Sequence, residues 1–209
     1  MTFKLPRVYP ITDVRLSGLS HAEQVEQLIE GGATLIQLRE KELTPREFYR
    51  EAAAALRVAR EHSVPLIIND RIDIARALGA DGVHLGQTDL PVEAARRLLG
   101  NRAIVGFSTH NLGQARMATF LPIDYLAVGP IFATSSKNDP DPVVGLRELA
   151  CIRAIVEGLP LVAIGGIKPE NASHALDAGA DSVAMIGSLL SDPLKISHQM
   201  KEMITIVSK

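Results

Sequence analysis

Cations and an amide occupy alternate positions in the run LIQLREK. Successive side chains of a β-strand point to opposite faces, so Gln37, Arg39 and Lys41 share one face, and the aliphatic residues between them face the other. This spacing would place two positive charges and an amide at the end of one strand, where a polyanion could bind. The competing interpretation is that the two cations pair with Glu40 and Glu42 on a solvated rim.

Two acidic residues follow neighbouring apolar runs. Asp70 ends PLIIND, and Asp89 lies in GVHLGQTDLP, directly after the next run. Carboxylates from adjacent loops could share one hard cation, and Mg²⁺ prefers one or two carboxylates together with phosphate oxygens and water. The pair therefore predicts a metal–diphosphate complex. The alternative is that each aspartate caps the helix that follows it, because Asp is a favoured N-cap residue.

The longest irregular stretch runs from Ile131 to Val144 and far exceeds the ~2 to 6 residues of an ordinary loop between a strand and a helix. Long loops of this kind are commonly lids. This one carries hydroxyl donors and a cation suited to phosphate, namely Thr134, Ser135, Ser136 and Lys137. A solvated polar loop without a ligand is the simpler interpretation.

Glycines and small polar residues end several other runs. Gly165-Gly166 and Gly187 would let backbone N–H groups approach a phosphate closely, although tight turns use glycine too. Ser108 could donate to a phosphate or cap the next helix. His84 is expected to point into the protein interior and to be hydrogen-bonded there.

Eight short aliphatic runs alternate with helical patterns, which is typical of a parallel sheet wrapped by helices. A closed (β/α)₈ barrel of one domain over residues 1–209 is the predicted fold, and an open doubly wound sheet is the fallback. The carboxyl ends of the strands would then form the active face. The runs begin near Val8, Leu35, Leu66, Val83, Ile104, Tyr125, Leu161 and Val183.

Capping signals and a repeat support this order of elements. Ser20 with Glu23, and Thr44 with Glu47, predict capping boxes, and Pro45 takes the favoured first helical position. A short pattern recurs as GGATLIQL, GADGVHL and GADSVAM, with a looser copy in PIDYLAV. Each of the three closer copies predicts a glycine at a helix end, followed by a tight turn into a strand.

Composition limits the partners of the chain. Its 209 residues carry a net charge of −2, which offers no global attraction to nucleic acid or to an anionic membrane. Cys151 is the one cysteine, so no intrachain disulfide can form. It lies within a helical apolar pattern, which predicts that it is inert core. The N-terminal MTFKLPRVYP lacks a long apolar run, so a cytoplasmic protein is expected. Assembly into a homo-oligomer stays open.

Taken in order, a series of motifs resembles the thiamine-phosphate synthase family. The motifs are YPITD, QLREK, INDR, GVHLGQTDLP, VGFSTH, AVGPIFATSSK and AIGGI, and the match runs from about Val8 to Leu190. The combination is specific, although no single piece would be. It implies a Mg²⁺-dependent transferase that joins a hydroxymethylpyrimidine diphosphate to a thiazole phosphate and releases pyrophosphate.

The same resemblance implies a role for each motif residue. The pyrimidine diphosphate would be bound by Gln37, Leu38, Arg39, Glu40, Lys41, Asn69, Ser108 and Lys137, of which Arg39, Lys41 and Lys137 would be catalytic. The thiazole phosphate would be bound by Thr134, Ser135, Ser136, Gly166, Ile186 and Gly187. Mg²⁺ would be bound by Asp70 and Asp89. Ser136 departs from the usual Thr but keeps its hydroxyl, whereas Gly187 replaces a common Ser and leaves only a backbone contact.

Three other functions compete with the synthase. A thiazole tautomerase of the related family would share the barrel and the thiazole-phosphate site, with His110 as its candidate proton shuttle. A barrel that only senses a phosphorylated metabolite would release no pyrophosphate. A sugar-phosphate isomerase would explain the glycines but would leave QLREK and TSSK without a purpose. The sequence offers no persuasive general base, which suits a dissociative substitution in which pyrophosphate leaves a carbon centre and an aromatic nitrogen without a proton captures the resulting cation.

Overall fold

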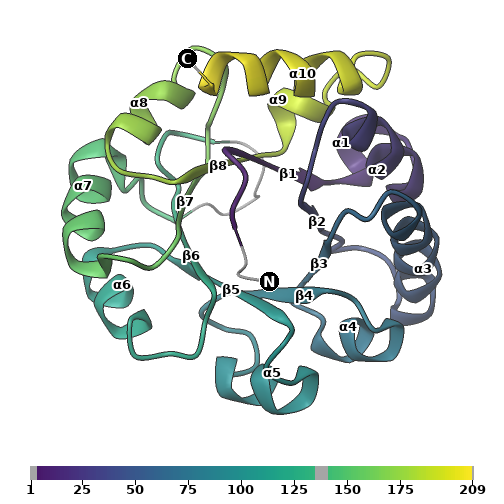
Figure 1. The fold of residues 1–209 in the computed structure, drawn as a ribbon, viewed down its shortest axis with the longest axis horizontal. Coiled ribbons are helices and arrows are strands. Elements are labelled where there is room, and N and C mark those ends of the chain that lie inside the picture. Colours follow the sequence, from purple (N-terminus) through teal and green to yellow (C-terminus); the bar gives the residue numbers. More distant parts are fainter. Residues whose placement is uncertain (1–3, 135–140, 209) are drawn as a thin grey trace.

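Strand pairing closes the sheet into a ring. The computed structural model describes residues 4–134 and 141–208. Each parallel strand pairs with the next one in the chain, and β8 pairs with β1. Figure 1 shows this ring of strands enclosed by the helices. The strands are β1 (Val8–Thr12), β2 (Ile36–Leu38), β3 (Leu66–Asn69), β4 (Gly82–Leu85), β5 (Ile104–Thr109), β6 (Tyr125–Val128), β7 (Leu161–Ile164) and β8 (Ser182–Met185).

The predicted (β/α)₈ barrel is therefore confirmed, and the open doubly wound sheet is wrong. The expected strand starts are correct to within one residue: β2 begins at Ile36, β4 at Gly82 and β8 at Ser182. The helices are α1 (Val14–Ser17), α2 (His21–Glu30), α3 (Pro45–Glu61), α4 (Ile72–Leu78), α5 (Val92–Leu99), α6 (Leu112–Ala118), α7 (Gly145–Val156), α8 (Ala172–Asp177), α9 (Gly187–Leu190) and α10 (Ile196–Val207).

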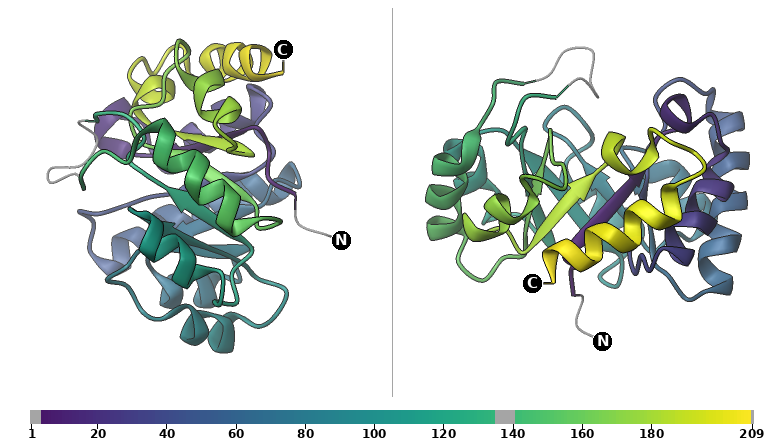
Figure 2. Two further views of the ribbon diagram at one scale, coloured as in Figure 1. Left: turned by 90° about the vertical axis from the view of Figure 1, so that its left-hand side faces the viewer. Right: turned by 90° about the horizontal axis from the view of Figure 1, so that it is seen from above.

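Local sequence signals determine where the long helices begin. Both predicted capping boxes form: the Ser20 side chain accepts from the N–H of Glu23, and the Thr44 side chain accepts from that of Glu47. Pro45 is the first residue of α3, where its missing N–H costs nothing. Figure 2 shows α10 along the outside of the barrel, where it contacts α2, α8 and α9.

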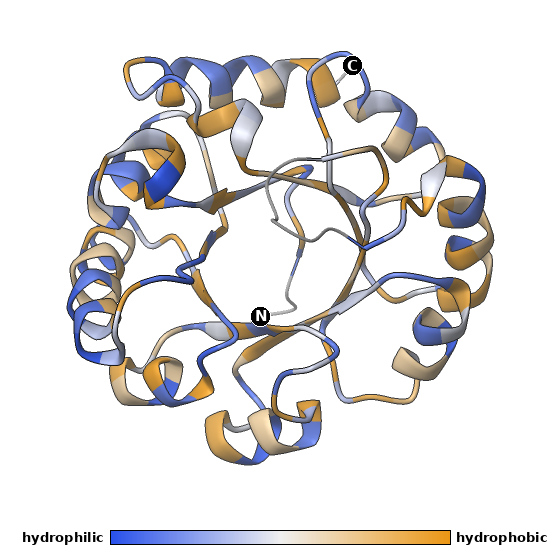
Figure 3. Cartoon of the chain, turned by 180° about the vertical axis from the view of Figure 1, so that it is seen from behind, coloured by the Kyte–Doolittle hydropathy of each residue, from blue (hydrophilic) through white to orange (hydrophobic). Residues whose placement is uncertain are grey.

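Two apolar cores lie on opposite sides of the strand ring. The larger core packs the outward strand residues against the buried faces of the helices. The smaller core fills the interior of the ring and includes two tyrosines, Tyr9 and Tyr125. Figure 3 shows hydrophobic stretches along the strands and mixed bands on the helices. Burial on both sides explains why the strands read as continuous aliphatic runs.

The aspartate in the repeated pattern GADGVHL, GADSVAM and PIDYLAV hydrogen-bonds to the preceding strand. An aspartate stands just before β4, β6 and β8, and its carboxylate accepts from the N–H of the first or second residue of the preceding strand. The distances are 2.9 Å from Leu66 to Asp81, 2.8 Å from Val105 to Asp124 and 2.8 Å from Leu161 to Asp181. These bonds satisfy strand N–H groups at the amino ends of the barrel strands.

Cys151 corrects one expectation from the sequence. It lies in α7, as its apolar surroundings suggested, but its side chain is exposed rather than in the core. Its helical position faces outward, while Leu149, Ile152 and Val156 supply the buried face. Among the described helices, none has the length and apolar character needed to cross a bilayer.

Replacing Asp124 by alanine should destabilise the barrel. Its carboxylate accepts from Val105 N–H at 2.8 Å and from Arg96 Nη2 at 2.7 Å, so its removal leaves both donors without this partner. We expect Asp124→Ala to lower the free energy of unfolding by about 2 kcal/mol in urea denaturation. The matched control is Asp177→Ala, at an exposed position in α8, which should change it by less than about 0.5 kcal/mol. Equal values for both variants would contradict this role.

Candidate active site at the carboxyl ends of the strands

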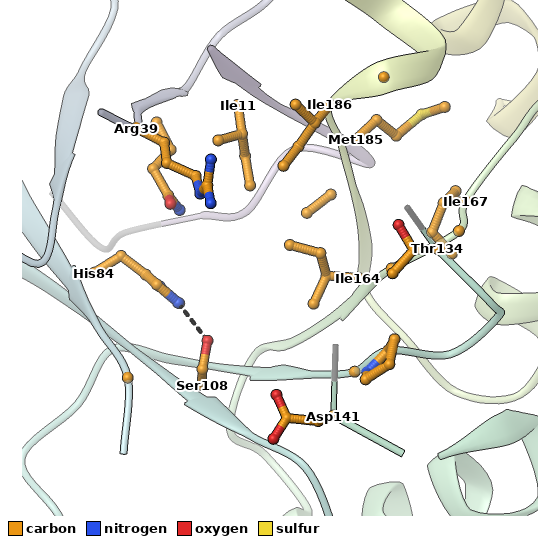
Figure 4. Close-up of a pocket in the computed structure, with 18 of the residues that line it drawn as sticks. Ile11, Arg39, His84, Ser108, Thr134, Asp141, Ile164, Ile167, Met185 and Ile186 are labelled. Carbon is orange, nitrogen blue, oxygen red and sulfur yellow. Dashed lines mark hydrogen bonds between the residues drawn. The ribbon is translucent and has the colours of Figure 1, made fainter. Parts of the chain in front are cut away.

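A cavity of about 900 Å³ opens at the carboxyl ends of the barrel strands. Figure 4 shows Arg39 and His84 pointing into it from one side, with Ile164, Ile186 and Thr134 on the other. The volume is in the range of cavities that hold small organic ligands. Its walls include most of the residues implied by the sequence motifs, namely Gln37, Arg39, Lys41, Asn69, Asp70, Asp89, Ser108, Thr134, Gly166, Ile186 and Gly187.

The remaining candidate residues have other positions. Leu38 is fully buried in the core between strands and helices, as the alternation of β2 requires. Glu40 belongs to the next turn and is described below. Ser135, Ser136 and Lys137 lie outside the described residues, so their predicted roles stay predictions. The described ends of this segment, Thr134 and Asp141, both line the cavity.

Arg39 is held in place by the end of the neighbouring strand. Its Nη1 donates to Asp13 Oδ2 at 2.8 Å, and both side chains are largely buried. Arg15 donates to the same carboxylate oxygen at 3.2 Å. A guanidinium has five N–H donors, so the pairing with Asp13 orients Arg39 and leaves donors for a ligand. The predicted alternative, an ion pair with Glu40 or Glu42, does not form within the described part of the chain.

Glu40 shapes the turn that carries Lys41. One of its carboxylate oxygens accepts from the N–H groups of Lys41 and Glu42, each at 2.7 Å, and the other lies 3.3 Å from His21 Nε2. Burial raises the pKa of Glu40, but the donated N–H groups and His21 outweigh burial and hold this pKa below its ordinary value. The Glu40 carboxylate is therefore engaged with the backbone beside the cavity.

Asp70 and Asp89 meet from adjacent loops. Lys41 Nζ donates to Asp70 Oδ2, while Asp89 Oδ2 accepts from Gly86 N–H at 2.6 Å. Burial raises the pKa of Asp89 above its ordinary value, and the negative charge of Asp70 raises it further, against the Gly86 bond. The following helices begin at N-caps Arg71 and Pro91, so neither aspartate acts as the predicted helix cap.

The donor set of this pair suits a hard divalent cation. Among the described residues, no group of three His, Cys, Asp or Glu side chains could hold a metal alone. Two carboxylates that repel each other, with space beside them for phosphate oxygens, match the coordination habit of Mg²⁺. A cation would also relieve the repulsion that raises the pKa of Asp89.

Polar side chains line the wall beside the aspartates. Asn69 is the last residue of β3 and is buried at the cavity surface. His84 Nε2 lies 2.8 Å from Ser108 Oγ, and His84 Nδ1 lies 2.9 Å from the hydroxyl of Tyr125. His84 is therefore the hydrogen-bonded interior histidine that was predicted. Asn111, rather than Ser108, caps the next helix, and Ser108 lines the cavity.

Glycines form the opposite wall, after β7 and β8. Gly165 and Gly166 have φ values of 95° and 65°, which side-chain-bearing residues rarely adopt. A Cβ at Gly166 would lie 2.5 Å from the carbonyl oxygen of Ala133, so glycine lets these two segments touch. Gly187 is the first residue of α9, and first-turn N–H groups of a helix lack helical partners. This wall can bind a phosphate through its backbone.

Some cavity and supporting residues were missed by sequence reasoning. Asp13 anchors Arg39, and its signal was available, because it directly follows the first apolar run as Asp70 follows the third. Lys168 adds a cation near the glycine wall, three residues after Gly165. The two tyrosines inside the ring gave no signal, since a tyrosine in an aliphatic run reads as core.

Comparisons with known proteins agree on one family. The family model described as thiamine monophosphate synthase matches residues 8–189. A thiamine-phosphate synthase of Chloroflexus aurantiacus is 44% identical over 97% of this chain and 94% of its own length. A thiamine-phosphate synthase of Koribacter versatilis is 46% identical over 96% of this chain and 97% of its own length. A solved thiamine phosphate pyrophosphorylase from Pyrococcus furiosus superposes with a TM-score of 0.86 at 36% identity, covering 97% of this chain and 95% of that one.

The raised pKa of Asp89 predicts a pH-dependent effect of Asp89→Asn. A carboxyl group whose pKa is raised on folding costs stability once it ionises, so the cost is absent in acid and grows as pH rises through the folded-state pKa. We expect Asp89→Asn to be more stable than the unsubstituted protein at neutral pH without metal. The two should be equally stable below the ordinary pKa of aspartate. Thermal unfolding over a pH series measures this.

Asp73→Asn is the control with the opposite sign. The ion pair with Arg71 lowers the pKa of Asp73, so this variant should lose stability at neutral pH and lose none in acid. Because Asp73 is 66% exposed, the loss should stay below about 0.5 kcal/mol. A destabilising Asp89→Asn at neutral pH would contradict the proposed repulsion between the two aspartates.

Proposed function

The chain belongs to the thiamine monophosphate synthase family, and we propose that it joins a hydroxymethylpyrimidine diphosphate to a thiazole phosphate, giving thiamine phosphate and pyrophosphate. The observation that carries this proposal is the convergence of Arg39, Lys41, Asp70 and Asp89 on one wall of a single cavity. A ligand that loses a diphosphate requires cations and a metal site at one place, and a purely isomerising enzyme does not.

The chain's own residues would act mainly by position and charge. Arg39, oriented by Asp13, and Lys41, placed by the Glu40 turn, would donate to the diphosphate as negative charge grows on its bridging oxygen. Asp70 and Asp89 would hold Mg²⁺, which neutralises phosphate charge when bound. The bond between the pyrimidine methylene carbon and the diphosphate oxygen would break first, and the thiazole nitrogen would then form the new carbon–nitrogen bond.

The glycine wall would position the second substrate. Gly166, Ile186, Gly187 and Thr134 line the cavity away from the aspartates, so a thiazole phosphate held there would face the reacting carbon. The thiazole nitrogen attacks with a lone pair and has no proton to lose, so the reaction requires no general base. Holding both rings in line supplies much of the rate enhancement by itself.

The setting of the reaction is also part of the proposal. We propose a cytoplasmic enzyme that acts on small molecules, without nucleic acid or membrane partners and with or without assembly into a homo-oligomer. An exposed free thiol at Cys151 suits a reducing compartment.

Ser135, Ser136 and Lys137 are proposed to complete the phosphate contacts. Lys137→Ala is expected to lower turnover by about 10²-fold if Lys137 meets charge that grows in the transition state.

A direct assay separates the candidate activities. The protein is mixed with both phosphorylated heterocycles, with and without Mg²⁺, and the products are read by mass spectrometry. Thiamine phosphate and pyrophosphate formed only with Mg²⁺ would support the synthase. Isomerised thiazole phosphate without coupling would favour the tautomerase, for which His110, bonded through Nδ1 to Gly129 oxygen at 2.6 Å, would be the candidate shuttle. Binding without any product would favour a sensor.

Lys41→Ala should reduce turnover while leaving the fold intact. If Lys41 stabilises charge that develops on the leaving diphosphate, its removal should lower kcat by about 10²-fold. The half-exposed position of Lys41 means that thermal stability should change little. The matched control is Lys201→Ala, at an exposed position in α10, which should keep full activity. A Lys41→Ala enzyme with unchanged kcat would contradict the role.

A further inference from the structure

A row of buried polar groups crosses the inside of the barrel from one cavity residue to another. Gln37 Nε2 donates to the Tyr9 hydroxyl at 3.2 Å, and the Tyr9 and Tyr125 hydroxyls lie 2.9 Å apart. Tyr125 then contacts His84 Nδ1 at 2.9 Å, and His84 Nε2 contacts Ser108 Oγ at 2.8 Å. Both ends of this row, Gln37 and Ser108, line the cavity.

Close packing holds the row together. The Tyr9 and Tyr125 rings meet edge to face with centroids 5.8 Å apart, and the His84 ring stacks on Tyr125 at 5.4 Å. A Cβ at Gly106 would lie 2.3 Å from the Tyr125 hydroxyl and 2.5 Å from His84 Nδ1, so only glycine leaves room for this bond. Burial raises the pKa of both tyrosines, so their hydroxyls stay neutral and each keeps one proton.

Proton counting gives the row a direction. Because Gln37 donates to Tyr9, the Tyr9 proton is available for Tyr125, and the Tyr125 proton for His84 Nδ1. The histidine then carries its own proton on Nε2 and donates it to Ser108 Oγ. The Ser108 hydroxyl can then donate its proton to a ligand in the cavity. At the other end of the row, the Gln37 side-chain oxygen, which does not bond to Tyr9, can accept from the ligand. Turning the amide over reverses every bond, and Ser108 then offers a lone pair while Gln37 offers an N–H.

We propose that Tyr9, Tyr125 and His84 are positioning residues that couple the hydrogen-bonding senses that Gln37 and Ser108 present to the cavity. When Ser108 turns its proton to the cavity, Gln37 turns its amide oxygen there; when Ser108 gives its proton to His84, Gln37 turns its NH₂ group to the cavity. A ligand is therefore favoured if it offers one acceptor and one donor to this pair. The inference rests on the proposed function and on the binding of the pyrimidine substrate by Gln37 and Ser108 that the family resemblance implies. In that substrate an amino group beside a ring nitrogen supplies a donor next to an acceptor.

The tautomer of His84 tests the direction of the row without any substrate. In protein with ¹⁵N-labelled histidine, NMR should show His84 protonated on Nε2, with its signals assigned by their loss in His84→Gln. Gln37→Glu at mildly alkaline pH puts an accepting carboxylate beside Tyr9, so every bond should reverse and the His84 proton should move to Nδ1. The ¹³C shift of the new carboxyl group reports its ionisation.

A second substitution controls for direct effects. The Gln37 side chain also bonds with Tyr125 directly, so the row is cut at Tyr125: in Gln37→Glu combined with Tyr125→Phe, the ionised carboxylate should no longer move the His84 proton. Tyr125→Phe removes the donor to Nδ1 and should leave His84 as a mixture of tautomers whatever the ionisation at position 37. An unchanged Nε2–H tautomer in Tyr125→Phe, or the same shift with and without the Tyr125 hydroxyl, would overturn the proposal.

Kinetics test the consequence for the reaction. Tyr9→Phe should raise KM for the pyrimidine diphosphate about three- to tenfold, as expected for one weakened neutral hydrogen bond, and should leave KM for the thiazole phosphate unchanged. Tyr49→Phe removes a hydroxyl from the exposed face of α3 and should change neither value. An equal loss for both substrates would indicate a merely structural role. If the protein makes no thiamine phosphate, the proposed function is wrong. The NMR experiment still tests the coupling of the hydrogen bonds from Gln37 to Ser108, because it uses no substrate.

Discussion

The continuous pairing of parallel strands, closed by β8 on β1, brings all the strand ends to one rim. Charged side chains then link neighbouring strands around part of that rim. Asp13 after β1 binds Arg39 after β2, and Lys41 binds Asp70 after β3. Asp70 in turn approaches Asp89 after β4. Each cation is therefore oriented by a carboxylate from an adjacent strand, and this charged part of the rim cannot form until β1 to β4 have paired in register.

The interior of the ring adds a second kind of order. Most of its packing is apolar, yet the tyrosine–histidine row passes through it with hydrogen bonds on the buried hydroxyls. Buried polar groups are costly unless satisfied, so such a row permits few arrangements. The charged rim and the polar interior meet at one cavity, because Arg39 and Gln37 come from the same face of β2. The end of β2 thus connects the side of the cavity proposed to bind the diphosphate to the side proposed to bind the pyrimidine.

Sequence alone predicted the parts of this structure that are local. Capping boxes and aliphatic runs depend on neighbours in the chain, and they gave the barrel with strand starts correct to within one residue. The alternation of β2 correctly placed Gln37, Arg39 and Lys41 at the cavity. Ion-pair partners were not predictable in this way, because Asp13 reaches Arg39 only through the register of β1 on β2. Exposure of Cys151 likewise depends on which face of α7 meets the barrel.

A crystal structure with Mn²⁺ and pyrophosphate would test the central claim most directly, since the anomalous signal of manganese locates the ion without ambiguity. The proposal predicts an anomalous peak between the carboxylates of Asp70 and Asp89, with pyrophosphate oxygens completing the coordination and contacting Arg39 and Lys41. A peak elsewhere, with the pyrophosphate bound to the glycine wall near Gly166 and Gly187, would contradict it.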